Sequence, residues 1–149
     1  MEPGFVPWLV VFAGKEDCVS RCDEPPSGEL LKAFGEFNRE DWFACHETLE
    51  ELWSGSSGEM RNFYQGTLQL AVALHHWRNG NFNGARLLLG SAVDYLKRVG
   101  KKCQRIDVAA LISAADRFRE IMVSLGPGRM ADIDVTLIPK MQLADSPST

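Results

Sequence analysis

The chain has 149 residues, of which 45% are hydrophobic and 24% charged, and its formal net charge at pH 7 is −4. These values are typical of one ordinary soluble domain and exclude a disordered or fibrous protein. The basic residues are spread from Lys15 to Lys140 instead of forming a stripe. The sequence therefore predicts no nucleic-acid partner.

The first 27 residues are interpreted as an N-terminal tail. They contain the apolar run FVPWLVVFA at 5–13, which is too short to span a bilayer and includes Pro7. No basic region precedes this run, as a secretory signal would require. These features predict no membrane association and a cytoplasmic location.

Four cysteines are present, too few and too irregularly spaced for a disulfide framework: they are Cys18, Cys22, Cys45 and Cys103. The first two could offer a pair of thiolates to a metal, but no second pair follows at the spacing of a zinc site. Cys18 and Cys22 are therefore interpreted as ordinary unpaired loop cysteines, Cys45 lies on the flank of the second predicted helix, and the set favours a reducing compartment.

Helical periodicity recurs in five stretches between short polar linkers, and no stretch from Gly28 onward alternates as a strand does. The predicted helices cover 29–37, 41–53, 59–77, 83–98 and 107–125. The third is apolar around more than half of its circumference and is predicted to be central. The sequence therefore predicts an all-α antiparallel bundle at 28–126, followed by a C-terminal tail at 127–149 that lays Leu137 and Ile138 onto the body.

Two polar turns, at 38–42 and 79–82, each place an aromatic residue just inside the next helix. They lie 40 residues apart and resemble the turns of tetratricopeptide helix hairpins. Since repeat arrays need about three units and no third is present, the sequence predicts related hairpins and no repeat domain.

A histidine and a carboxylate fall on the apolar stripe of the second predicted helix. At 100° per residue, Trp42, His46, Leu49 and Trp53 lie within roughly 60° of one another, and Glu50 lies about 40° beyond His46. Burying such a pair costs free energy unless each member has a partner. The pair is therefore interpreted as either a satisfied polar lock or a working site.

Ordered motifs extend from this helix into the next two: HETLEELW at 46–53, FYQGTLQLAVALHH at 63–76 and GNFNGA at 80–85. Together with Phe37 and Asn38 they resemble the helical domain-of-unknown-function family numbered 309, from about residue 31 to residue 96. The resemblance implies an all-helical bundle and supplies no established reaction. It implies family positions at Phe37, His46, Glu47, Glu50, Trp53, Gln65, Gly66, His75, Gly80, Gly84 and Ala85. Glu40 departs from the pattern, because the family usually has glycine there.

Three interpretations of the polar centre are open, and its candidate residues are His46, Glu47, Glu50, Tyr64, Gln65 and His75. In the first, His46, Glu50 and His75 bind a divalent metal. In the second, His46 and Glu50 act as general acid and base, although no nucleophile is apparent. In the third, His46 donates to Glu50 or Tyr64 and fixes how two helices dock.

The third interpretation is preferred because the zinc motif is incomplete and the helix register is unfavourable for a metal. A tight hairpin would leave the rings of His46 and His75 roughly 14 Å out of register, with Tyr64, Gln65 and Leu68 level with His46. We therefore expect no bound metal or cofactor. The predicted function is a non-enzymatic structural module, or one that binds a small ligand or a protein partner, and the alternative is a metal-dependent or acid/base hydrolytic enzyme. A homo-oligomer is left open.

Overall fold

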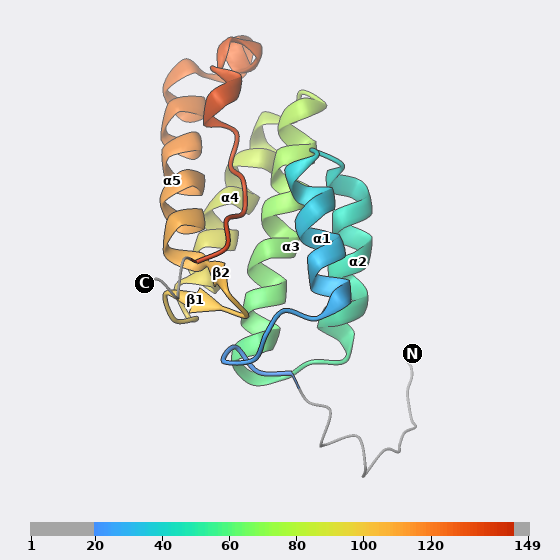
Figure 1. The fold of residues 1–149 in the computed structure, drawn as a ribbon. Coiled ribbons are helices and arrows are strands. Elements are labelled where there is room, and N and C mark those ends of the chain that lie inside the picture. The colour runs from blue at the N-terminus through green and yellow to red at the C-terminus, as the bar shows by residue number, and fades with distance from the viewer. Residues whose placement is uncertain (1–19, 145–149) are drawn as a thin grey trace.

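The computed structural model describes residues 20–144, so the apolar run at 5–13 and Cys18 lie outside the described residues. The described residues form a helical bundle with one short β-hairpin (Figure 1), which confirms the predicted all-α class. The helices are α1 (Gly28–Asn38), α2 (Trp42–Ser54), α3 (Gly58–Arg78), α4 (Phe82–Leu96) and α5 (Val108–Leu125). The antiparallel strands are β1 (Lys102–Cys103) and β2 (Ile106–Asp107), which the sequence analysis did not predict.

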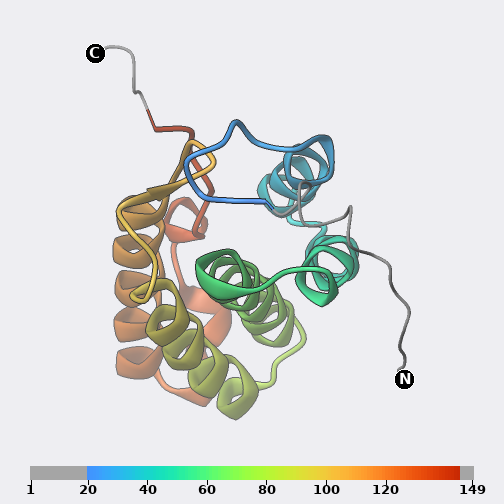
Figure 2. The same ribbon diagram turned by 90° about the horizontal axis from the view of Figure 1, so that it is seen from below.

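The central position predicted for the third helix is confirmed. Seen along the bundle, α3 lies between α2 and α4, with α1 beside α2 and α5 beside α4 (Figure 2). Phe63, Leu70 and Leu74 of α3 are completely buried. Gly66 lets α4 approach closely, because a Cβ built there would lie 2.7 Å from Cγ of Leu96.

The two turns that resemble each other in sequence also have the same backbone hydrogen bonds. In each turn, three successive amides donate to carbonyls four, three and five residues earlier, over 2.8–3.1 Å. The donors are Arg39, Glu40 and Asp41 in one turn and Asn79, Gly80 and Asn81 in the other. The middle residue of each turn is left-handed, with φ of 66° at Glu40 and 80° at Gly80. The predicted likeness of the two hairpins is thus present in the backbone.

The segment from 127 to 144 runs back along the bundle beside α5 (Figure 1) and includes the 3₁₀ helices Pro127–Asp132 and Val135–Leu137. The indole Nε1 of Trp77 donates to the carbonyl of Met130 over 3.1 Å. Ile138 is 4% exposed and Leu137 packs against the core, as predicted. This segment therefore completes the hydrophobic core of the bundle.

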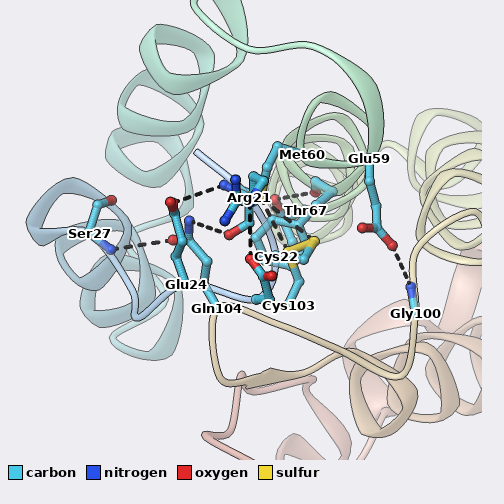
Figure 3. Close-up of a disulfide and its surroundings, with 12 residues drawn as sticks. Arg21, Cys22, Glu24, Ser27, Glu59, Met60, Thr67, Gly100, Cys103 and Gln104 are labelled. Carbon is cyan, nitrogen blue, oxygen red and sulfur yellow. Dashed lines mark hydrogen bonds and ion pairs between the residues drawn. A yellow bond between two sulfur atoms is a disulfide. The ribbon is translucent and has the colours of Figure 1, made fainter. Parts of the chain in front are cut away.

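A disulfide joins Cys22 to Cys103 (Figure 3), so the prediction of unpaired loop cysteines is wrong for this pair. The two residues are 81 positions apart and meet only through the tertiary fold. Their sulfurs lie 3.7 and 3.3 Å from Sδ of Met60. Cys45 of α2 is a buried free thiol.

Gln104 fixes the segment before α1 to the turn of the β-hairpin (Figure 3). Its side chain is 1% exposed, donates to the carbonyl of Arg21 over 3.1 Å and accepts from the amide of Ser27 over 3.3 Å. Its own amide donates to the carbonyl of Cys22 over 2.7 Å. The disulfide and these bonds together hold 20–27 against the hairpin. Among residues 20–144, no helix is long and apolar enough to cross a membrane.

Candidate functional site

A hollow of about 150 Å³ opens between α2 and α3, and both predicted histidines line it. The remaining wall consists of Trp42, Phe43 and Val72. The ring centroid of Phe43 lies 6.0 Å from the ring centroid of His46 and 6.0 Å from that of His75. The wall is therefore mostly aromatic and aliphatic, with two imidazoles as its titratable groups.

The predicted mismatch of roughly 14 Å between the two histidines is wrong because the linker between α2 and α3 is not a tight turn. Trp42, the first residue of α2, packs edge-on against Trp77 near the end of α3, with ring centroids 6.4 Å apart. Since α2 has 13 residues and α3 has 21, the surplus length lies at the start of α3. Ser57 is extended, with φ of −151° and ψ of 169°, and carries the chain along the bundle to that start.

The predicted pairing of His46 with Glu50 is absent from the structure. Glu50 is exposed, and no hydrogen bond joins it to His46. Instead, Nδ1 of His46 and Nε1 of Trp42 are buried without a hydrogen-bond partner among the described residues. These two nitrogens belong to residues that line the same hollow, and buried polar atoms of this kind call for a physical explanation.

The other predicted residues of the polar centre do not line this hollow. Glu47 is exposed on α2 and Gln65 is half-buried on α3. Tyr64 is 1% exposed and packs against Phe63, with ring centroids 5.8 Å apart. Burial raises the pKa of Tyr64 above its usual value. Of the six candidates, the structure brings together His46 and His75 only.

Asn79 determines the tautomer of neutral His75. Its side-chain nitrogen lies 3.1 Å from Nε2 of His75 and also donates to the carbonyl of His75 over 3.1 Å. An amide nitrogen is only a donor, so Nε2 accepts and the ring proton is on Nδ1. His75 thus presents an N–H group at its other ring nitrogen.

Cys45, which precedes His46 in the sequence, is not an activated nucleophile. Burial, followed by the nearby charges of Glu36 and Asp41, raises the pKa of the Cys45 thiol far above its usual value. Its sulfur donates to the carbonyl of Ala33 over 3.4 Å. Such a thiol reacts poorly because the thiolate is the reactive form. Within 20–144, no three His, Cys, Asp or Glu side chains are grouped closely enough to hold a metal ion.

Phe43 and Val72 were not identified by the sequence analysis. Phe43 is 57% exposed although it is aromatic, and it lies three residues before His46 on the same helix. That spacing places the two rings side by side on a helix surface and was the available signal. Val72 lies three residues before His75 on α3 and carries no separate signal, because it looks like any core residue.

Comparison with known proteins relates the part of the chain that carries this hollow to an existing family. Residues 30–88 match the family model described as "Domain of unknown function (DUF309)", in agreement with the predicted resemblance. These residues run from α1 into α4 and include both histidines.

Two curated relatives have the printed names of uncharacterised proteins. The chain is 41% identical over 58 residues to "Uncharacterized protein YpuF" of Bacillus subtilis (strain 168). The matched residues make up 38% of this chain and 33% of that relative. The chain is 36% identical over 69 residues to an "Uncharacterized protein" of Aquifex aeolicus (strain VF5), which covers 44% of this chain and 21% of that relative. The matches thus span about a third and a fifth of these relatives. No solved structure matches the chain significantly.

Proposed function

We propose that this chain, whose residues 30–88 match a family model without an assigned function, is a non-enzymatic binding module. Its site is the hollow between α2 and α3, and its ligand places a small apolar group there. The observation that carries the proposal is the hollow itself, about 150 Å³ in volume and walled by Trp42, Phe43 and Val72. An engineered apolar cavity of roughly this size binds benzene.

The unpartnered nitrogens support an occupant that can also form a hydrogen bond. A buried polar atom without a partner costs about 1–3 kcal/mol. Rotation of the His46 ring about its Cβ–Cγ bond exchanges the positions of Nδ1 and Cδ2, and so changes which edge of the imidazole faces the hollow. His75, whose Nε2 is bonded to Asn79, is a second imidazole in the same wall.

The enzymatic alternative has less support. It relied on His46 acting with Glu50 and His75, but Glu50 is exposed and not bonded to His46. A cytoplasmic location stays a prediction, and the Cys22–Cys103 disulfide weighs against it. Glutathione and thioredoxin keep most cytosolic thiols reduced.

The proposal is tested by titrating the ¹⁵N-labelled protein with phenol, whose ring and hydroxyl suit the hollow. We expect the indole Nε1–H signal of Trp42 and the imidazole signals of His46 and His75 to shift and saturate. Val72→Phe should abolish the shifts because the larger ring fills the hollow. Val123→Phe, a matched change at an exposed position of α5, should leave them intact. Shifts that persist in the Val72→Phe protein, or no saturable shifts at all, would refute the proposal.

A further inference from the structure

The outer surface of α2 carries a line of side chains that begins at the hollow. Phe43, Glu47 and Glu50 follow one another at the i, i+4 and i+7 positions, so they share one face of the helix. Glu51 lies one turn beyond Glu47 and widens this line. We call these four residues the acidic stripe. Phe43 is 57% exposed, and the three glutamates of the acidic stripe are also exposed, so the whole stripe faces solvent.

Negative charge is concentrated in the hairpin that carries this stripe. Residues 28–54 contain seven acidic and two basic side chains, a net charge of −5, whereas the whole chain carries −4. One of the seven, Glu40, is neutralised by Arg78 at 2.7 Å and Lys140 at 3.2 Å. The carboxylates of the acidic stripe form no ion pair with another described residue. Their field is therefore available to a partner.

A second hollow, of about 450 Å³, borders the acidic stripe on the side of α1. Glu47 and Glu51 form part of its wall, together with Glu36 and Lys32. Glu36 is 6% exposed and is held in place by the hydroxyl of Thr48, which donates to it over 2.8 Å. The stripe thus runs between an apolar hollow beside α3 and an acidic hollow beside α1.

We propose that the occupant of the apolar hollow is a side chain of a basic protein segment that lies along the acidic stripe. This inference rests on the proposed function and names its partner. The hollow has room for one side chain such as leucine or phenylalanine, and aromatic residues such as the exposed Phe43 at its rim are enriched at protein interfaces. Lysine or arginine residues of the segment meet Glu47, Glu50 and Glu51.

Length favours a protein segment over a small molecule. From Phe43 to Glu50 the stripe extends about 10 Å along the helix axis, at 1.5 Å per residue. A molecule that fits the apolar hollow cannot also contact carboxylates two turns away. A helix with an apolar residue followed by basic residues at i+4 and i+7 presents both groups at the required spacing, as in other helix-in-groove complexes.

The experiment selects binders of the full chain from a displayed library of random 16-residue segments. We expect the recovered peptides to be basic and to share one large apolar residue. The best peptide is then labelled with fluorescein, and its affinity is measured by anisotropy. Replacing its apolar residue by alanine should weaken binding about tenfold or more, as loss of a hot-spot side chain does. Recovery of acidic peptides, or of no binder, would overturn the inference.

Protein variants separate the stripe from charge in general. Glu47→Gln, Glu50→Gln and Glu51→Gln together should weaken the peptide about tenfold or more, as loss of complementary charge does. The matched control removes the same charge from α4 and α5, through Asp94→Asn, Asp116→Asn and Glu120→Gln, and should change the affinity less than about twofold because these sites are remote and screened. Equal losses of peptide affinity in both triple variants would show that the attraction is unspecific, and would refute binding along the acidic stripe.

Two further variants test the apolar hollow. Val72→Phe should abolish peptide binding, and Phe43→Ala, at an exposed position that folding tolerates, should weaken it strongly. Insensitivity to both would place the peptide elsewhere. Full competition by spermine would identify a small cation as the ligand instead. If phenol still binds in the hollow but no peptide does, the inference fails alone; if neither binds, the proposed function fails as well.

Discussion

Gly66 sits inside α3 where α4 passes closest, and replacing it by alanine tests the packing of these two helices. In an ordinary helix interior, alanine is more favourable than glycine by about 1 kcal/mol. Here the new Cβ would lie 2.7 Å from Cγ and 2.8 Å from Cδ2 of Leu96, and 3.1 Å from the carbonyl oxygen of Ala92. Cγ of Leu96 can move only if this buried side chain leaves its rotamer, and the carbonyl oxygen of Ala92 can move only with α4 itself.

The expected effect is the difference between two opposing terms. Overpacking of a filled core typically costs about 1–3 kcal/mol, and the gain in helix propensity recovers about 1 kcal/mol. Gly66→Ala should therefore lower the free energy of unfolding by up to about 2 kcal/mol. Gly90→Ala is the matched control within α4, because its Cβ would meet only the side chain of Arg119, with Nε at 3.6 Å and Cζ at 4.0 Å, which are ordinary contacts. It should raise the stability by about 0.5–1 kcal/mol.

Urea unfolding followed by circular dichroism at 222 nm measures both variants. The midpoint should fall for Gly66→Ala and rise for Gly90→Ala, with unchanged slopes. In a protein that already carries Leu96→Ala, the cost of Gly66→Ala should largely disappear, since the obstructing side chain is gone. If Gly66→Ala raises the midpoint as much as Gly90→Ala does, the close contact between α3 and α4 is wrong.

Three further predictions concern single interactions. Replacing Cys22 and Cys103 by serine should lower the free energy of unfolding by about 4.5 kcal/mol, from the loop entropy of a sequence separation of 81, and dithiothreitol should leave this variant unaffected while it destabilises the native chain. Glu50→Ala should change stability by less than about 0.5 kcal/mol; a loss above 1 kcal/mol in urea unfolding would restore its predicted pairing with His46. The pKa of Glu40 is lowered, first by its hydrogen bond from an arginine, so the stability it contributes is present above its unfolded pKa of 4.5 and is lost as the pH falls through its lower folded pKa. The stability gap between native protein and Glu40→Gln should therefore close toward pH 2, and a constant gap would contradict the ion pairs.

The helices could be predicted from the sequence because each buries one continuous face against its neighbours. The boundaries agree to within about two residues wherever a capping residue or a glycine turn marks them, as at Asp107, whose side chain caps the start of α5, and Gly126 after α5. The short β-hairpin had no comparable signal, because each of its strands has two residues. Its turn has Gln104 and Arg105 in left-handed conformations. Glycine or asparagine at these positions would have been a sequence signal for a hairpin.

The sequence predicted which residue of α2 belongs to the site, but not which residue of α3 lies opposite it. Periodicity placed His46 on an inner stripe, which is correct to the extent that its Nδ1 is buried. Which residue of α3 faces it depends on the rise of the linker at 54–58, and glycines and serines leave that rise undetermined. The position of His46 beside Phe43 and not beside Glu50 does not depend on that rise, because all three residues lie on α2, where Phe43 is three residues before His46 and Glu50 is exposed. The disulfide was missed because pairing across 81 residues has no local pattern.

The β-hairpin receives both ends of the described chain. Residue 22 is covalently bonded to residue 103, and the amide of residue 144 donates to the carbonyl of residue 105. Ser20 and Ala144 are thus each tied, within two residues, to one small element, so a linker between them would yield a circular permutant that can be opened at 55–57 without breaking a helix. This hairpin lies at the end of the bundle opposite the turns that begin α2 and α4 (Figure 1), so such a rearrangement would leave the wall of the apolar hollow intact.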